Sequence, residues 1–164
     1  MNRNLQALLL AIFRLVKATG LLATGPGRYV FERAYNAYKP FLEAGPVEQL
    51  RPFVGDGAWV VDIGANVGFF TTRFGRWTPN GAHVLAIEPE DLNHRRLTNA
   101  VAKAGLAEKV KIIKGVVSDA DGTAILKINP NHPGDHRLGE EGIPVAAYRL
   151  DTLIADLGEP QIAL

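Results

Sequence analysis

The chain has 164 residues, 47% of them hydrophobic, which suits one folded domain with a sizeable core. Lys and Arg number 18 against 17 Asp and Glu, so no strongly basic field exists and no nucleic-acid partner is expected. The sequence contains no cysteine, which excludes a disulfide framework, a thiolate zinc site and a cysteine nucleophile.

The first 50 residues predict an N-terminal helical region. Residues 5–16 are rich in leucine, but Arg14 and Lys17 interrupt the hydrophobic run short of the roughly 20 residues that span a bilayer. We expect an amphipathic helix that packs on the domain or contacts a membrane surface peripherally. After a glycine-rich loop, residues 29–39 carry aromatic residues at helical spacing, a pattern more typical of a core helix than of a lid over an acceptor site.

The next segment, residues 58–63, is the first predicted strand, and a glycine-containing turn follows it. Apart from Asp62, this strand is hydrophobic on both faces, as in a buried parallel sheet. Gly64 and Gly68 allow a tight turn and a close approach of the backbone to a ligand, while Asn66 can steady the turn or cap the next helix. Asp62 can accept hydrogen bonds from turn amides or from a ligand ammonium. The turn therefore predicts a nucleotide-like cofactor.

A second acidic residue lies at the end of the second predicted strand. Residues 83–87 lead into Glu88 and Pro89, about twenty residues past the turn, a spacing that fits a carboxylate bound to ribose hydroxyls. A dinucleotide-binding fold uses the same carboxylate, so Glu88 alone does not distinguish a dinucleotide from a nucleotide-like cofactor without a pyrophosphate.

The sequence of the turn distinguishes a dinucleotide from a cofactor without a pyrophosphate. Counted from Gly64, the dinucleotide pattern G-x-G-x-x-G needs glycine where Asn66 and Phe69 stand. A pyrophosphate prefers the bare amides of a glycine-rich helix start, so the turn disfavours a dinucleotide.

The following segments alternate between helix and strand. A helix is predicted after each of the first two strands, the second capped by Asp91 and ended by Gly105, and a third strand covers residues 110–113. This alternation predicts a Rossmann-like α/β fold with a doubly wound, mainly parallel sheet. Its ligand site is expected at the carboxyl ends of the strands, where Gly64, Glu88 and Ser118 meet.

Residues 124–128 and 145–148 predict two further strands, paired around a polar loop. The loop holds His132 and His136 with Asp135 between them. These residues are a weak case for a metal site, and none is expected. A general base for a hydroxyl acceptor and a solvated loop with local hydrogen bonds both remain open, so no catalytic residue is assigned.

Several segments together resemble class I S-adenosylmethionine-dependent methyltransferases, and more narrowly the FkbM family. They are Val61–Gly68, Ala86–Pro89, Gly115–Asp119 with Gly122, Gly134–Leu138 and Leu150–Leu153. The resemblance covers about residues 50 to 164, and the combined order of the segments is far more specific than any one of them.

The resemblance implies methyl transfer from S-adenosylmethionine to a hydroxyl oxygen of a sugar or natural product. Because this cofactor is cytosolic, we expect a cytoplasmic protein. It implies that Asp62, Gly64 and Asn66 line the methionine end of the cofactor, that Glu88 binds the ribose, and that Ser118 with Asp119 flanks the adenine. The expected cofactor site comprises Asp62, Gly64, Ala65, Asn66, Gly68, Glu88, Pro89, Ser118 and Asp119.

The family pattern continues where this sequence stops. Residues 161–164 look like the start of the fourth strand, which in the family runs on into an acidic motif beside the methyl group. We therefore expect residues 51–164 to be the front half of the methyltransferase domain, a truncated form that retains cofactor binding and loses acceptor binding. The bare edge of its sheet can self-associate.

Two other functions remain open. An NAD-dependent oxidoreductase predicts NAD affinity, and Asn66 in the turn weighs against it. A non-catalytic remnant or interaction module predicts no cofactor affinity and an oligomer that depends on concentration. The sequence identifies neither the methyl acceptor nor the oligomeric state.

Overall fold

The computed structural model describes residues 24, 47–79, 81–129, 136–155, 157–158 and 162–163. The chain divides into two compact units, Met1–Gln49 and Leu50–Leu164, and the elements below belong to the second. The helices predicted over residues 5–16 and 29–39 lie outside the described residues.

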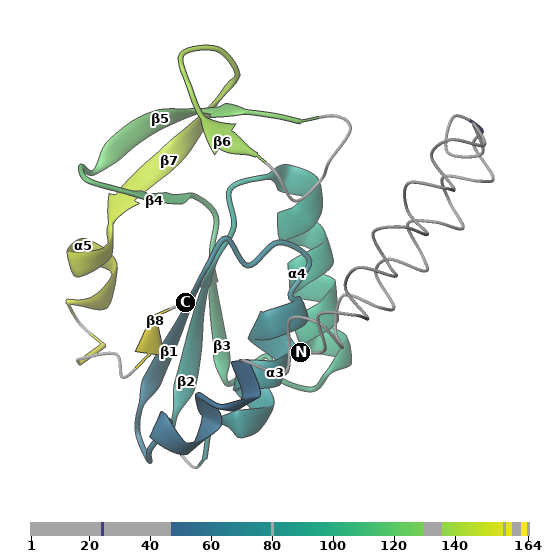
Figure 1. Ribbon diagram of the computed structural model, residues 1–164, viewed down its shortest axis with the longest axis vertical. Coiled ribbons are helices and arrows are strands. Elements are labelled where there is room, and N and C mark those ends of the chain that lie inside the picture. Colours follow the sequence, from purple (N-terminus) through teal and green to yellow (C-terminus); the bar gives the residue numbers. More distant parts are fainter. Residues whose placement is uncertain are drawn as a thin grey trace, which may run out of the picture. The chain divides into compact units, whose positions relative to one another are not determined.

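The first sheet of the second unit contains four parallel strands in the order β3-β2-β1-β8 (Figure 1). Their bounds are Trp59–Ile63 for β1, His83–Ile87 for β2, Val110–Ile113 for β3 and Ile162–Ala163 for β8. β1 pairs with β2 along its whole length and with β8 through Val60 and Val61. This arrangement confirms the predicted parallel α/β fold, and the segment predicted to start a fourth strand pairs beside β1.

Two helices, α3 (Phe69–Trp77) and α4 (Asp91–Lys103), lie on one side of this sheet (Figure 1). Successive side chains of a strand point to opposite faces, so Val60 and Asp62 share the face that α3 covers. Phe74 of α3 and Leu97 of α4 are fully buried, as is Val60. Phe74 and Leu97 therefore lie on the core-facing sides of the two predicted helices.

The helix ends follow the predicted signals with one exception. Gly105, at φ +68°, follows α4 as expected. The N-cap of α4 is Glu90, whose carboxylate accepts hydrogen bonds from the backbone N–H of Leu92 and Asn93 at 2.9 and 2.7 Å. The prediction that Asp91 caps this helix is wrong, because Asp91 is its first residue and forms an ion pair with Lys114.

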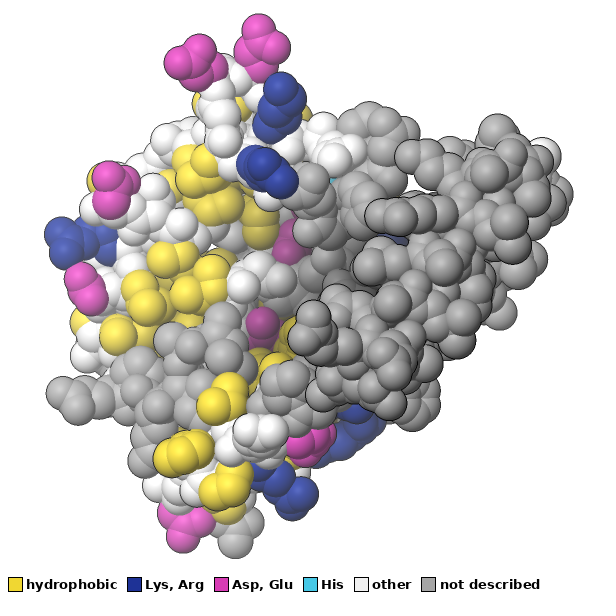
Figure 2. Space-filling model, viewed as in Figure 1, with side chains coloured by type: hydrophobic (Ala, Val, Ile, Leu, Met, Phe, Trp, Pro, Cys, Tyr) yellow, Lys and Arg dark blue, Asp and Glu magenta, His cyan; other side chains and the backbone are white. Residues whose placement is uncertain are grey.

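The opposite face of the first sheet packs against α5 (Leu150–Ile154). Leu150, Leu153 and Ile154 contact the buried cluster of Val61, Leu85 and Ile87. Hydrophobic side chains gather beside α5 in Figure 2, in yellow. The sheet therefore has helices on both faces, as a doubly wound fold requires.

A second, smaller sheet contains four strands in the order β4-β7-β5-β6. They are β4 (Val116–Ser118), β5 (Gly122–Lys127), β6 (Arg137–Leu138) and β7 (Ile143–Arg149). β5 pairs with β7 antiparallel, which confirms the two paired strands predicted over residues 124–128 and 145–148. The short strands β4 and β6 were not predicted.

Asp121 joins two of the segments that carried the family resemblance. Its carboxylate accepts the backbone N–H of Arg149 and the hydroxyl of Thr152, both at 2.8 Å. These two bonds lower the pKa of the exposed Asp121 carboxyl. The start of β5 is thereby linked to the start of α5.

Candidate functional site

The turn between β1 and α3 is fixed by the end of β2. The backbone N–H groups of Gly64 and Ala65 both donate to the carbonyl oxygen of Ile87, at 2.9 and 3.0 Å. Gly64, Asn66 and Gly68 have positive φ angles of +76°, +50° and +85°. Asparagine tolerates this conformation better than most residues with a Cβ. The three residues singled out in the sequence are therefore the three that the turn needs.

The two glycines of the turn are required for different reasons. A Cβ on Gly64 would meet nothing within 4 Å, so only its backbone conformation calls for glycine. A Cβ on Gly68 would lie 2.9 Å from Cδ1 of the buried Leu97 in α4. Gly68 thus allows the start of α3 to approach α4, whereas Gly64 faces open space beside the pocket described below.

Glu88 connects the turn to the carboxyl end of β2. Its Oε2 accepts the backbone N–H of Asn66 at 2.8 Å, and its Oε1 accepts that of Glu90 at 3.0 Å. The side chain is only 4% exposed. Burial raises the pKa of Glu88, and the two amide bonds and the nearby charge of His136 oppose that rise.

Asp62 lies under the turn and faces α3. Its Oδ2 accepts the hydroxyl hydrogen of Thr71 at 2.5 Å. The residue is 5% exposed, and burial raises its pKa to about 6, although the bond from Thr71 acts in the other direction. Asp62 therefore attaches α3 to β1 at the point where the turn begins.

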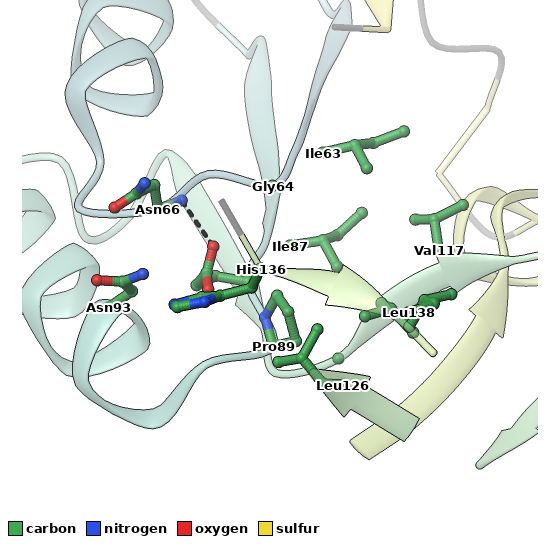
Figure 3. A pocket seen from close by; sticks show the side chains of 13 residues that line it. Ile63, Gly64, Asn66, Ile87, Pro89, Asn93, Val117, Leu126, His136 and Leu138 are labelled. Atoms are coloured by element: carbon green, nitrogen blue, oxygen red, sulfur yellow. Dashed lines mark hydrogen bonds between the residues drawn. The ribbon is translucent and has the colours of Figure 1, made fainter. Parts of the chain in front are cut away.

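A pocket of about 230 Å³ lies where the carboxyl ends of β1 and β2 meet the second sheet. In Figure 3 the polar side chains of Asn66, Asn93 and His136 lie toward one end, and Ile63, Val117 and Leu138 lie toward the other. The residues that line it are Ile63, Gly64, Asn66, Ile87, Glu88, Pro89, Asn93, Gly115, Val116, Val117, Leu126, His136 and Leu138.

Comparison with family models gives a match to the methyltransferase FkbM domain over residues 62–164. The chain belongs to the FkbM methyltransferase family. The matched region begins at Asp62, within β1, and includes the turn, Glu88 and every residue that lines the pocket, so the pocket is formed within the FkbM domain.

Comparison with solved structures gives matches to part of the chain, three of which follow. A "putative rRNA-methylase" from Clostridium thermocellum is 22% identical, with 42% of this chain and 37% of that chain covered and a TM-score of 0.40. An S-adenosylmethionine-dependent methyltransferase from Aquifex aeolicus is 25% identical, with 43% and 37% covered and a TM-score of 0.39. Another from Thiobacillus denitrificans, in complex with S-adenosyl-L-homocysteine, is 26% identical, with 44% and 31% covered and a TM-score of 0.36.

The match covers less than two-fifths of the length of each of these three proteins. No curated protein matches the chain.

The FkbM domain brings four of the nine predicted cofactor residues together in the pocket: Gly64, Asn66, Glu88 and Pro89. Asp62, Ala65 and Gly68 are buried around the turn and do not line it. Ser118 and Asp119 follow from β4 in the second sheet, where the hydroxyl of Ser118 donates to Asp119 Oδ1 at 3.1 Å. Their assignment to the adenine stays a prediction.

Several pocket residues were not predicted as site residues. Asn93 comes from the first turn of α4, whereas Leu126, His136 and Leu138 come from the second sheet. His136 and Leu138 belong to Gly134–Leu138, one of the segments that carried the family resemblance. That resemblance was the sequence signal that could have identified them as site residues. Asn93 lies two residues after Asp91, which was predicted only as a helix cap, and no sequence signal indicated that Asn93 lines a pocket.

The described part of the chain contains no group of three His, Cys, Asp or Glu that could hold a metal ion. His132 and Asp135 lie outside that part. Within the same described residues, no helix is long and hydrophobic enough to cross a bilayer.

Proposed function

We propose that the FkbM domain binds S-adenosylmethionine in this pocket and serves methylation of a hydroxyl group on a sugar or natural product. The observation that carries the proposal is the joining of the Gly64–Gly68 turn to Glu88 at adjacent strand ends. In open α/β sheets, ligands bind in the crevice outside the carboxyl ends of the strands.

Glu88 has the hydrogen-bonding capacity that a ribose needs. An ionised carboxylate has about four lone-pair sites, two on each oxygen. One site on each oxygen accepts a backbone N–H, from Asn66 or Glu90, and the second remains for a ligand hydroxyl. The same side chain can therefore hold the turn and bind a diol.

The hydrophobic end of the pocket suits a flat aromatic ring. Ile63 and Leu138 are 39% and 48% exposed there, a high value for large hydrophobic side chains. An adenine covering them would remove this surface from water at about 25 cal/mol per Å². The volume of about 230 Å³ is below the range of roughly 300–1,000 Å³ for small-molecule sites, so the pocket fits a nucleoside better than the whole cofactor.

When bound, S-adenosylmethionine supplies an electrophilic methyl group for in-line displacement by a hydroxyl oxygen. The chain's own part is to hold and orient the nucleoside: the turn sets the position of Asn66, and Glu88 fixes the sugar. Asp62 keeps α3 against β1, so that the turn retains its shape when the pocket fills.

Calorimetric titration with S-adenosyl-L-homocysteine tests this function. We expect micromolar binding by the full chain, weakened at least about tenfold in Glu88→Ala, because a hydrogen bond to a charged group contributes about 1.5–3 kcal/mol. Glu108→Ala is the matched control, since it removes an exposed carboxylate outside the pocket. A thermal melt of each variant confirms that it is folded.

NAD is the competing ligand in the same experiment. Binding of NAD in place of S-adenosyl-L-homocysteine would favour an oxidoreductase. A folded wild-type chain that binds neither ligand would contradict cofactor binding and support the non-catalytic interpretation.

A further inference from the structure

His136 reaches the pocket from the second sheet, and its ring is held by the backbone. It directly precedes β6, on the far side of the β5–β6 connection from Asn129. The backbone N–H of Asn129 donates to His136 Nδ1 at 3.1 Å. The ring is therefore oriented by the main chain at the end of β5, before any ligand is present.

This hydrogen bond determines which ring nitrogen carries the proton. A nitrogen that accepts an N–H bond has no hydrogen of its own, so the neutral ring of His136 carries its hydrogen on Nε2. Nε2 then has no lone pair with which to remove a proton from an acceptor hydroxyl. The geometry makes His136 a hydrogen-bond donor to the pocket and argues against the general base considered from the sequence.

Glu88 and His136 are complementary across the pocket. Both line it, and an electrostatic interaction with His136 lowers the pKa of the Glu88 carboxyl, so the two groups are near each other. Glu88 offers only acceptor oxygens, whereas Nε2 of His136 offers only a donor hydrogen. A hydroxyl group both donates and accepts, so a vicinal diol can satisfy the two side chains together.

We infer that His136 is a cofactor-binding residue that donates an Nε2–H hydrogen bond to a ribose hydroxyl oxygen of S-adenosylmethionine, opposite the acceptor Glu88. The inference rests on the proposed function and adds a role for the second sheet. The bond from Asn129 selects the tautomer that the sugar needs.

Two substitutions separate the two nitrogens of the ring. His136→Gln places an amide N–H near the position of Nε2, whereas His136→Asn keeps an acceptor near the position of Nδ1 and removes the donor. In titrations with S-adenosyl-L-homocysteine we expect His136→Gln to stay within about threefold of the wild type. His136→Asn is expected to bind about tenfold more weakly, the size of one net hydrogen bond. His94→Asn, a histidine that does not line the pocket, is the control and keeps wild-type affinity.

Nitrogen-15 NMR of the histidine rings tests the tautomer on which the inference depends. We expect the His136 signals, identified by their loss in His136→Asn, to show the Nε2–H tautomer in the unliganded chain. An Nδ1–H tautomer, or equal affinity of His136→Asn and the wild type, would overturn the inference and leave the proposed function intact. Absence of wild-type binding would overturn both, so the two failures are distinguishable.

Discussion

Asp62 and Glu88 are both acidic, both buried and both at strand ends, but they differ in what they bind. Asp62 points to α3 and bonds to Thr71, whereas Glu88 bonds to the turn and lines the pocket. Burial raises the pKa of each carboxyl, because each charge is less well solvated in the folded chain than in water. Such a shift at a strand end is typical of a functional site.

The pH dependence of stability tests the environment of Asp62. Its pKa is about 6 in the folded chain against a usual value of 3.8, so the folded state holds this proton more tightly. Between those two pH values the unfolded state binds fewer protons, and the free energy of unfolding falls as pH rises. Above pH 6 the loss amounts to roughly 3 kcal/mol.

Urea denaturation of the wild type and Asp62→Asn at pH 4, 5, 6 and 7 measures this contribution. Asparagine keeps an acceptor for Thr71 but does not titrate, so the wild type should lose stability relative to the variant from pH 4 to pH 7. Parallel pH profiles for the two chains would show that Asp62 does not hold a raised pKa.

At the scale of elements, the contact between the start of α3 and α4 depends on Gly68, which has no side chain. Gly68 combines a left-handed backbone with a position against Leu97. The helix pair, the turn and Glu88 form one continuous support for the pocket floor. A change at Gly68 is therefore expected to affect both packing and turn shape.

Gly68→Ala should destabilise the chain by about 2–5 kcal/mol. Roughly 1–2 kcal/mol comes from the left-handed conformation and about 1–3 from overpacking against the buried Leu97. Gly81→Ala is the matched control, since Gly81 has φ +74° but a Cβ there would meet nothing within 4 Å. Equal losses in the two variants, measured by urea denaturation, would mean that packing against α4 contributes nothing.

At the scale of the whole domain, stability should differ between the parts that form the pocket. β1 and β2 pair over five residues and are mostly buried, whereas β6 has two residues, both exposed. Amide hydrogens in the first sheet therefore require global opening, and those of β6 exchange through local opening.

Native-state hydrogen exchange followed by NMR checks this difference. We expect the amides of Val61 and Leu85 to exchange at least about a hundredfold more slowly than those of β6. S-adenosyl-L-homocysteine should reduce the difference, since it would contact both sheets. Uniform protection across both sheets in the unliganded chain would contradict the expectation.

Much of the fold is predictable because its signals are local. The first three strands are short, mostly hydrophobic runs that alternate with the two long helices, and Gly64, Gly68 and Gly105 mark turns that need positive φ. β4 and β6 have three and two residues, too few for a periodic pattern. Glu90 rather than Asp91 caps α4 because the backbone is still extended at Glu90, whose carboxylate accepts the N–H groups of Leu92 and Asn93, whereas Asp91 is already helical.

The site, like the fold, contains residues that the sequence predicted and residues that it did not. Gly64, Asn66, Glu88 and Pro89 were predicted together because adjacent parallel strands bring their carboxyl ends to one edge. Strand alternation puts Asp62 on the same face as Val60, which explains its position under the turn. The approach of His136 and Leu138 depends on how the second sheet packs, and no local pattern encodes that.

The pairing of β8 with β1 has a consequence for how the protein is made. β1, β2 and β3 lie in one continuous stretch from Trp59 to Ile113, but β8 begins only at Ile162. At about 5–20 residues per second, a ribosome needs roughly 2–10 seconds to synthesise the interval between β3 and β8. During that time the turn and Glu88 can already assemble on the nascent chain while one side of β1 has no neighbour, and a chaperone or another nascent chain can then occupy it.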